Sequence, residues 1–433
     1  MDKGFTYSDV LIKPKKTPLS SRREADLTSK FSRNIDLNIP LVSSNMETVT
    51  EEDMAITMVK HGGIGIIHQF CSPEEQAKIV KRVKRETGYV VTNPVTITSD
   101  SSVGEAKKIL EETNRESIVV GDEEIKGLLT RNDYVLADDD RLVEDVMTED
   151  IVTVDPSIDM DEARQILQEN TLNTLIVEDN GLHGIITTED IRKAKEWDRS
   201  VRDDSGRLRV AAAVGVGDAH ERAPLLVEEG VDALVLDLAH CHSEYGIQRV
   251  KEMKERYDVD IVAGNIATAE AAEELVEAGA DGLKVGVGPG KVCSTRLMTG
   301  AGVPQLTAVD DVSTVAEDHG IPVIADGGLE QPGDIVKAVG AGASCICSGS
   351  FFAGTDEAPG PIVKKDGKRF KKYRGSASYN SNKRRHEKQG ERTEDMDVFV
   401  EGVSVLVDYK GTVEDVIDSL CKGVKSGVSY CGK

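Results

Sequence analysis

The chain has 433 residues and a formal net charge of −24 at pH 7, with 39% hydrophobic and 30% charged residues. This length exceeds one ordinary hydrophobic core, which predicts at least two domains, and the composition is typical of a globular protein. Such an acidic chain lacks the basic surface that phosphate backbones require, which excludes nucleic acid as its main partner.

The start of the chain and its cysteines predict a cytoplasmic protein. Residues 1–6 lack the pattern of a signal peptide, and no apolar run is long enough to cross a bilayer, so no membrane partner is expected. The seven cysteines are an odd number without repeated pairs, which is typical of thiols in a reducing compartment rather than of a disulfide framework.

The first clear elements are a strand at 64–68 and a helix that begins at Pro73. The run Ile64-Gly-Ile-Ile-His68 is continuously apolar up to its last residue, as in strands buried on both faces. Proline is favoured in the first turn of a helix, because its missing N–H would have no partner there. These elements therefore predict one strand and one helix of a parallel sheet.

An internal repeat follows. Three blocks recur at a constant spacing of 57 residues, beginning at Glu105, Ser117 and Gly127 and again at Glu162, Thr174 and Gly184. Each copy reads as a short strand, an amphipathic helix, two β-rich runs and a second helix that starts at a Thr-x-x-Asp motif. Only two copies exist, so the repeat predicts a paired module and not a solenoid.

Each copy resembles the CBS domain, and the pair resembles a Bateman module. We expect this module at residues 92–201, with the copies at about 92–145 and 146–201. The resemblance implies that the Thr-x-x-Asp motifs bind adenine or guanine nucleotides, through Thr130 and Asp133 and through Thr187 and Asp190. A carboxylate can accept both ribose hydroxyls while the helix start meets phosphate. The same motif also caps a helix without any ligand, and this alternative stays open.

After the repeat, apolar runs alternate with helical stretches. The runs lie at 211–215, 233–237, 261–265, 282–286, 322–326 and 344–348. This alternation predicts a (β/α)₈ TIM barrel formed by residues 1–91 and 202–433, with the repeat inserted into it. Polar residues stand at or just past the strand ends, where such a barrel carries its chemistry: Asp237, Asn265, Asp326 and Ser350. An open doubly wound sheet is the weaker alternative, because no Gly-x-Gly-x-x-Gly turn opens the first unit.

The loop at 284–296 is the strongest candidate for a reactive site. It reads Lys-Val-Gly-Val-Gly-Pro-Gly-Lys-Val-Cys-Ser-Thr-Arg, so Cys293 follows a glycine-rich turn. Glycines allow sharp turns that expose backbone groups, and a cysteine beside such a turn is a candidate nucleophile. Cys345 and Cys347 lie in an apolar strand instead and are expected to be buried.

Four motifs together resemble the IMP dehydrogenase and GMP reductase family. They are Gly288–Arg296, Asp326–Gly328, Tyr373–Gly375 and Ser43–Met46. The resemblance covers nearly the whole chain. It implies that Cys293 attacks C2 of a purine nucleotide and forms a covalent thioimidate, with a nicotinamide cofactor exchanging hydride at C2. In the dehydrogenase, water hydrolyses the adduct to xanthosine monophosphate (XMP). In the reductase, the adduct forms as ammonia leaves.

The resemblance also assigns roles to further residues. Thr295 would help to activate water or ammonia, and Arg385 and His386 are the nearest candidates for a base. The substrate contacts would be Ser43, Met46, Asp326, Gly328, Gly349, Ser350, Tyr373, Glu401 and Gly402. The cofactor contacts would be Asp237, Asn265, Gly286 and Gly288. A potassium ion would bind the backbone carbonyls of Gly288, Gly290 and Cys293. The resemblance implies a homotetramer, or an octamer joined by the CBS pairs.

Two positions depart from the family pattern. Lys291 stands where the family usually has serine, which changes both the charge and the reach of the side chain. Dehydrogenases carry an Arg-Tyr pair on a flap, but the segment 376–392 contains none, and Arg385-His386 is the nearest substitute. A histidine there could relay a proton.

The sequence therefore leaves an ordered set of functions. The first is an IMP dehydrogenase that converts IMP, NAD and water to XMP and NADH. The alternative is a GMP reductase that converts GMP and NADPH to IMP and ammonia. A second alternative is a non-catalytic protein that senses adenine nucleotides through its CBS pair.

Overall fold

A computed structural model of the chain describes residues 3–86, 89–91, 94–113, 117–121, 125–156, 158–179, 181–376 and 402–432. The chain forms two compact units. The barrel unit comprises Met1–Lys84, Arg199–Val201 and Leu208–Lys433, and the inserted unit comprises Arg85–Asp198 and Arg202–Arg207. No helix in the described ranges is long and apolar enough to cross a membrane.

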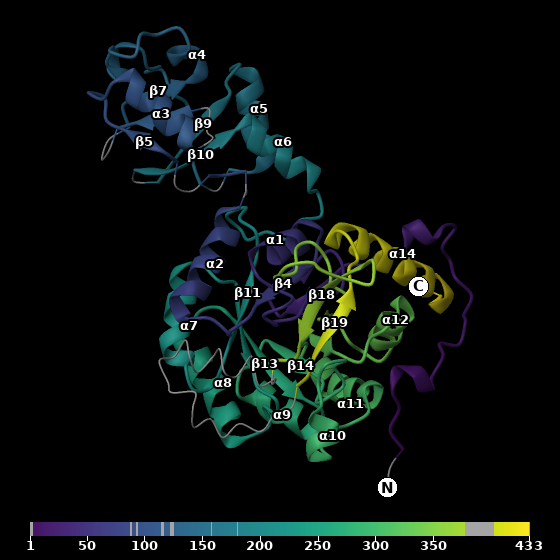
Figure 1. The fold of residues 1–433 in the computed structure, drawn as a ribbon. Helices are drawn as coiled ribbons and strands as arrows, with labels where there is room; N and C mark the ends of the chain where they lie inside the picture. Colours follow the sequence, from purple (N-terminus) through teal and green to yellow (C-terminus); the bar gives the residue numbers. More distant parts are fainter. Residues whose placement is uncertain are drawn as a thin grey trace. The chain divides into compact units, whose positions relative to one another are not determined.

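Eight parallel strands close the barrel unit into a TIM barrel (Figure 1). In spatial order they are β11 (Ala211–Val214), β12 (Ala233–Asp237), β13 (Asp260–Ile266), β14 (Gly282–Val285), β15 (Val323–Asp326), β16 (Cys345–Ser348), β3 (Leu41–Ser43) and β4 (Ile64–Ile67). The predicted barrel is confirmed, and the doubly wound alternative is wrong because the sheet closes on itself. Nearly every residue of these strands is buried, which explains their continuous apolar runs.

Helices surround the barrel as the alternation predicts (Figure 1). They are α1 (Glu52–Lys60), α2 (Pro73–Arg85), α7 (Ala219–Glu228), α8 (Glu244–Arg256), α9 (Ala269–Glu277), α11 (Gln305–Asp318), α12 (Pro332–Gly340) and α14 (Val413–Cys431). Helix α14 approaches α12 closely, because a Cβ at Gly423 would lie 2.5 Å from Pro332 and one at Gly427 would lie 2.5 Å from Val336. The final helix is therefore packed into the barrel wall.

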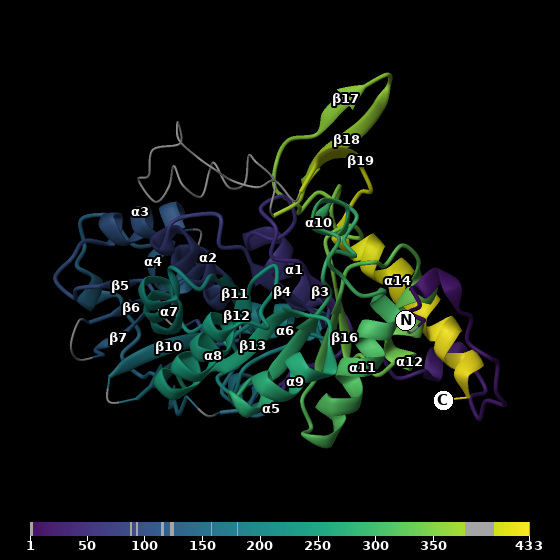
Figure 2. The same ribbon diagram turned by 90° about the horizontal axis from the view of Figure 1, so that it is seen from below.

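Shorter elements complete the barrel unit. These are η1 (Tyr7–Asp9), η2 (Arg22–Glu24), β1 (Ser29–Ser32), β2 (Ile35–Leu37), α10 (Thr295–Thr299), β17 (Val363–Lys365), β18 (Lys368–Arg374) and β19 (Ser404–Asp408). The β1–β2 hairpin covers the amino ends of the barrel strands, where Ser32 donates to Asp260 at 2.5 Å. The antiparallel sheet β17-β18-β19 projects from the barrel (Figure 2).

The inserted unit is built from two copies of one β-α-β-β-α unit. The first contains β5 (Thr96–Ile97), α3 (Val103–Thr113), β6 (Ser117–Val120), β7 (Gly127–Thr130) and α4 (Arg131–Tyr134). After η3 (Val143–Asp145), the second contains β8 (Thr153–Val154), α5 (Met160–Glu169), β9 (Thr174–Glu178), β10 (Leu182–Thr187) and α6 (Thr188–Glu196). The element order that the repeat predicts is therefore present in both copies.

The two copies contact each other through equivalent residues. Val119 and Leu128 of the first copy share a buried cluster with Ile176 and Ile185 of the second, and each pair follows the 57-residue spacing. The backbone repeats this exchange: Val91 pairs with Ile185, and Thr148 pairs with Leu128. The residue that precedes each copy thus extends the sheet of the other copy, which joins them into one body.

Candidate active site

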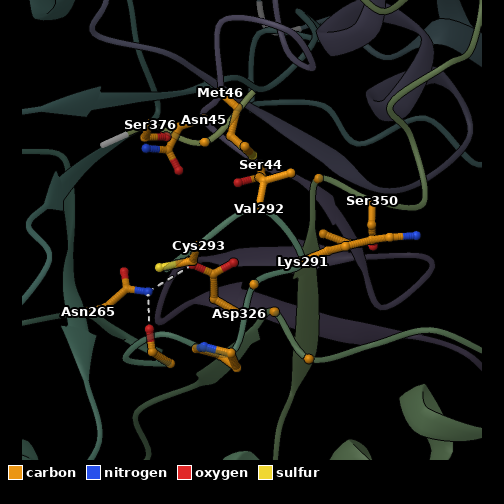
Figure 3. A pocket seen from close by; sticks show the side chains of 18 of the residues that line it. Ser44, Asn45, Met46, Asn265, Lys291, Val292, Cys293, Asp326, Ser350 and Ser376 are labelled. Atoms are coloured by element: carbon orange, nitrogen blue, oxygen red, sulfur yellow. Dashed lines mark hydrogen bonds between the residues drawn. The ribbon is translucent and has the colours of Figure 1, made fainter. Parts of the chain in front are cut away.

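A cavity of about 550 Å³ lies at the carboxyl ends of the barrel strands. Its walls come from the loops after β3, β4, β12, β13, β14, β15 and β16, together with the end of β18 and Lys410. In TIM barrels this end carries the chemistry, because it gathers residues from many strands around one space. The cavity is therefore the candidate active site (Figure 3).

The glycine-rich loop after β14 presents Cys293 to this cavity (Figure 3). Gly286 has a φ of +152°, and a Cβ there would lie 2.1 Å from the carbonyl oxygen of Asp326, so the loop needs glycine to pass that strand end. Arg296 braces the loop from behind by donating to the carbonyls of Val287 at 3.0 Å and Val303 at 2.5 Å. The fold thus holds the thiol in a defined position.

Cys293 is half-buried, and its Sγ lies 3.2 Å from the hydroxyl of Thr295 at the start of α10. A thiol beside a hydroxyl can form a covalent bond to a substrate while the hydroxyl orients a second small molecule. Both groups line the cavity. By contrast, Cys345 and Cys347 are fully buried in β16, as the sequence predicts.

The chain segments on either side of 377–401 meet at the Cys293 loop. Cys293 forms an antiparallel bridge with Gly402, and the amide of Val403 donates to the carbonyl of Val292 at 3.0 Å. The amide of Gly375 donates to Val403 at 3.0 Å. The candidates Arg385, His386 and Glu401 lie outside the described residues.

A buried lysine joins three of the strand-end residues. The Lys284 ammonium lies 2.5 Å from Oδ2 of Asp326, 3.2 Å from Oδ1 of Asp237 and 2.8 Å from Oδ1 of Asn265. Burial opposes its charge, but the attraction of Asp326 and Asp237 outweighs this and raises the pKa of Lys284. Lys284 is therefore charged and fixes both aspartates at the cavity wall.

Asn265 continues this network. Its Nδ2 donates to Oδ2 of Asp326 at 2.8 Å and to the carbonyl of Gly286 at 2.7 Å (Figure 3). One side chain therefore links the strand end that carries Asp326 to the loop that carries Cys293. Such supporting contacts hold reacting groups in a productive geometry.

The opposite end of the cavity is formed by the turn 348–351, Tyr373 and Met46. A Cβ at Gly349 would lie 2.5 Å from the Tyr373 hydroxyl and 2.6 Å from the Met46 sulfur, so only glycine fits there. Burial and the nearby Asp326 raise the pKa of the Tyr373 phenol. Its hydroxyl therefore stays neutral and can donate a hydrogen bond to an anion.

Most of the residues singled out from the sequence come together in this cavity. Met46, Asp237, Asn265, Gly286, Gly288, Gly290, Cys293, Thr295, Asp326, Gly328, Gly349, Ser350 and Tyr373 all line it. Ser43 does not line it: this residue is fully buried in β3 and accepts the Thr50 hydroxyl at 3.0 Å, and Ser44 lines the cavity instead. Gly402 pairs with Cys293 without lining the cavity.

Sequence reasoning missed several lining residues, of which Lys284 and Gln69 are the clearest. Lys284 could have been found, because a charged residue interrupts the apolar run 282–286. Gln69 carried no such signal. Its Oε1 is buried without a hydrogen-bond partner among the described residues, and its Nε2 lies 3.4 Å from the Asp237 carbonyl.

In the inserted unit, both Thr-x-x-Asp motifs cap helices. The Thr130 hydroxyl donates to Asp133 at 2.7 Å, and the Thr187 hydroxyl donates to Asp190 at 2.5 Å. Each motif forms a reciprocal capping box, at the start of α4 and of α6. The capping function is thus present in the structure, while a ligand role is compatible with the same positions.

A TIM barrel with a cysteine on a glycine-rich loop, above aspartates held by a buried lysine, defines an enzyme with one catalytic cavity. Residues 4–433 match the family described as "IMP dehydrogenase / GMP reductase domain". The chain belongs to this family, and it is an oxidoreductase of the kind that uses a nicotinamide cofactor.

Its relatives carry both family names. The chain is 46% identical to an inosine-5'-monophosphate dehydrogenase of Nitrosopumilus maritimus over 99% of its own length and 92% of that protein. It is 44% identical to a GMP reductase of Leishmania donovani over 100% of its length and 92% of that protein. A cysteine-to-alanine variant of GMP reductase from Trypanosoma brucei, in complex with guanosine 5'-monophosphate, is 41% identical with a TM-score of 0.89, covering 100% of this chain and 92% of that one.

Proposed function

We propose that this protein oxidises or reduces C2 of a purine nucleoside monophosphate through a covalent bond to Cys293. The observation that carries the proposal is the position of the Cys293 thiol in one cavity with Asp326, Tyr373 and the turn 348–351. The GMP complex of the Trypanosoma brucei relative supports a purine nucleotide as ligand.

The cavity offers matching groups for each part of such a nucleotide. The Asp326 carboxylate can accept the two ribose hydroxyls, since Lys284 and Asn265 hold it in place. The Tyr373 hydroxyl, the Ser350 hydroxyl and the amides near Gly349 can donate to phosphate oxygens. With ribose and phosphate held at these points, the base extends toward Cys293.

The chemical step uses the thiol and its neighbour. In the oxidative direction the Cys293 sulfur adds to C2 of IMP, and departure of hydride from C2 leaves a thioimidate. Water then adds to C2, the C–S bond breaks, and XMP and the thiol are regenerated. Thr295 lies 3.2 Å from the sulfur and can orient that water. A bound nicotinamide supplies the hydride chemistry.

The cofactor would occupy the side of the cavity formed by Asp237 and Gln69. The residues present fit it, because the buried Oε1 of Gln69 needs a donor and a carboxamide N–H is one. Asp237 can accept ribose hydroxyls, and Asn265, Gly286 and Gly288 form the adjoining wall.

We propose the dehydrogenase direction, from IMP with NAD to XMP with NADH. The reductase direction, from GMP with NADPH to IMP and ammonia, is the second candidate. It is favoured by one observation, the lack of an Arg-Tyr pair in 376–392, where Arg385 and His386 would have to substitute. Neither the cavity nor the relatives favours a non-catalytic nucleotide sensor.

A spectroscopic assay decides between the two directions. Purified protein with IMP and NAD should produce NADH absorbance and XMP. If that mixture is inert while GMP consumes NADPH and releases ammonia, the dehydrogenase direction is excluded. If neither pair reacts, the proposed chemistry is wrong.

A potassium ion belongs to the same proposal. The carbonyl oxygens of Gly288, Gly290 and Cys293 belong to one short turn, and carbonyl oxygens are suitable ligands for this ion. The Gly290 carbonyl also accepts the amide of Cys293 at 3.0 Å, so it would serve both partners.

We further propose that the inserted unit is a CBS pair that binds adenine or guanine nucleotides at Thr130 and Asp133 and at Thr187 and Asp190. The duplicated fold and the exchanged backbone bridges of the two copies support this assignment. Assembly into tetramers, or into octamers through this unit, is part of the same proposal.

A further inference from the structure

Two lysines from distant parts of the chain lie at the same end of the cavity. Lys291 stands two residues before Cys293, and Lys410 follows β19; both line the cavity together with Ser350. Figure 3 shows the Lys291 side chain extending past Ser350. This is the end where the proposed function puts the phosphate.

Lys410 is fixed to the turn 348–351. Its Nζ donates to the carbonyl of Ser350 at 2.5 Å and to the carbonyl of Phe351 at 2.9 Å. These bonds use carbonyls on the turn, so the amides and the Ser350 hydroxyl stay available to a ligand. Lys410 therefore positions the turn while adding a positive charge beside it.

The two ammonium groups form a local cationic cluster on a very acidic protein. Among the described residues, neither Lys291 nor Lys410 forms an ion pair. The whole chain carries a net charge of −24, which repels an anionic substrate at long range. A cluster at the phosphate end offsets that repulsion where the substrate enters, and a serine at position 291 would not.

The lysines influence each other. Desolvation and the positive charge of Lys291 lower the pKa of Lys410 to about 8, against the opposite effect of Asp408 on β19. A phosphate dianion between the lysines would favour the charged form and raise that pKa again. Binding of the dianion would therefore be coupled to proton uptake near pH 8.

We propose that Lys291 and Lys410 select the dianionic phosphate of the substrate, Lys291 by direct contact and Lys410 by positioning the turn and adding charge. The inference rests on the proposed function, because it takes a nucleoside monophosphate as the ligand. It goes beyond that function by assigning phosphate recognition to a charged pair, in place of a neutral hydroxyl at position 291.

The first test is a calorimetric titration of the full-length protein with IMP, GMP, inosine and guanosine. Lys291→Ser should weaken binding of both nucleotides about tenfold, the value of one charge-assisted hydrogen bond, and leave the nucleosides unaffected. Inorganic phosphate should compete with IMP less well in this variant. Lys251→Ser removes an exposed charge from α8 and should bind as the wild type does.

The second test concerns Lys410 and pH. Wild-type affinity for IMP should fall as pH rises through about 8, because Lys410 then loses its proton. Lys410→Arg keeps the charge at all these pH values, so its affinity should stay constant over the same range. A loss of inosine binding in Lys410→Arg, or an unchanged pH profile, would overturn the role of Lys410.

The outcomes separate this inference from the proposed function. Equal affinities of Lys291→Ser and Lys251→Ser for IMP overturn the cluster, even if the enzyme turns over normally. Failure of the wild type to convert either IMP or GMP overturns the proposed function instead. The titration measures binding alone, so it gives its result in both cases.

Discussion

The Lys284 ammonium lies 2.5 Å from Oδ2 of Asp326, and the same group reaches Asp237 at 3.2 Å. The side chain of Lys284 is only 3% exposed. A single buried cation therefore connects the aspartate proposed to hold the substrate ribose with the aspartate proposed to hold the cofactor. The two halves of the cavity share one electrostatic support.

Lys284→Met should disrupt both halves at once. It leaves two buried carboxylates near each other without their cation, which costs about 3–5 kcal/mol for one partner of a buried pair. We expect a lower denaturation midpoint and a higher KM for both nucleotide and cofactor. Lys284→Arg, which keeps the charge, should restore part of the stability. A Met variant with wild-type stability and KM values would show that the network is not needed.

This network also shows what the sequence could predict. The rule that chemistry follows the carboxyl ends of parallel strands identified Asp237, Asn265 and Asp326, and the structure brings all three to one cavity. Lys284 escaped because it lies inside a strand rather than after one. A charge in an apolar run is the only signal it leaves in a single sequence.

Other misses have different physical causes. The motif 43–46 was recognised, but a shift of one residue decides which side chain faces the cavity, and the structure exposes Ser44 rather than Ser43 to it. Lys410 reaches the turn 348–351 from about sixty positions away, as the bond to Ser350 records. Contacts at such a separation leave no local pattern in the sequence.

Thiol chemistry should single out Cys293. Burial raises the pKa of Cys241 to about 12 and that of Cys421 to about 11, so these thiols stay protonated at neutral pH. Iodoacetamide should therefore modify the half-buried Cys293 and Cys431 first, and IMP or GMP should protect only Cys293. Peptide mass spectrometry after labelling measures this. Equal labelling of Cys293 with and without nucleotide would contradict its place in the site.

Cys293→Ala should abolish turnover in either direction while the protein stays folded, because the thiol makes only one polar contact, to Thr295. Cys431→Ala is the matched control and should keep full activity. The readouts are the rate of NADH or NADPH change and the thermal midpoint. Substantial turnover by the alanine variant would exclude the covalent mechanism.

Gly349→Ala should weaken nucleotide binding without unfolding the barrel. The added Cβ would meet the Tyr373 hydroxyl at 2.5 Å and the Met46 sulfur at 2.6 Å, so both must move away from the cavity. We expect a KM for the nucleotide raised about tenfold, since overpacking of this kind costs about 1–3 kcal/mol. Gly333→Ala in α12 meets open space and should behave as the wild type.

Potassium should be required if the loop 288–293 binds the ion. Replacing potassium with sodium at constant ionic strength should lower the turnover rate, and adding potassium back should restore it. Choline chloride controls for the salt itself. Equal rates in all three salts would exclude the ion from the catalytic loop.

Nucleotide binding by the inserted unit can be separated from its helix caps. A nucleotide that binds the native state at a hundred times its Kd stabilises it by about 2.7 kcal/mol, so ATP or GTP should raise the thermal midpoint of the full-length Cys293→Ala protein. Asp133→Asn and Asp190→Asn together should remove this shift, but they also weaken the caps of α4 and α6. Asp159→Asn is the matched control, because Asp159 caps α5 by accepting the amide of Glu162 at 2.8 Å and lies outside both motifs. That control should lower the midpoint slightly and keep the nucleotide shift. If all variants keep the shift, the motifs serve only as caps.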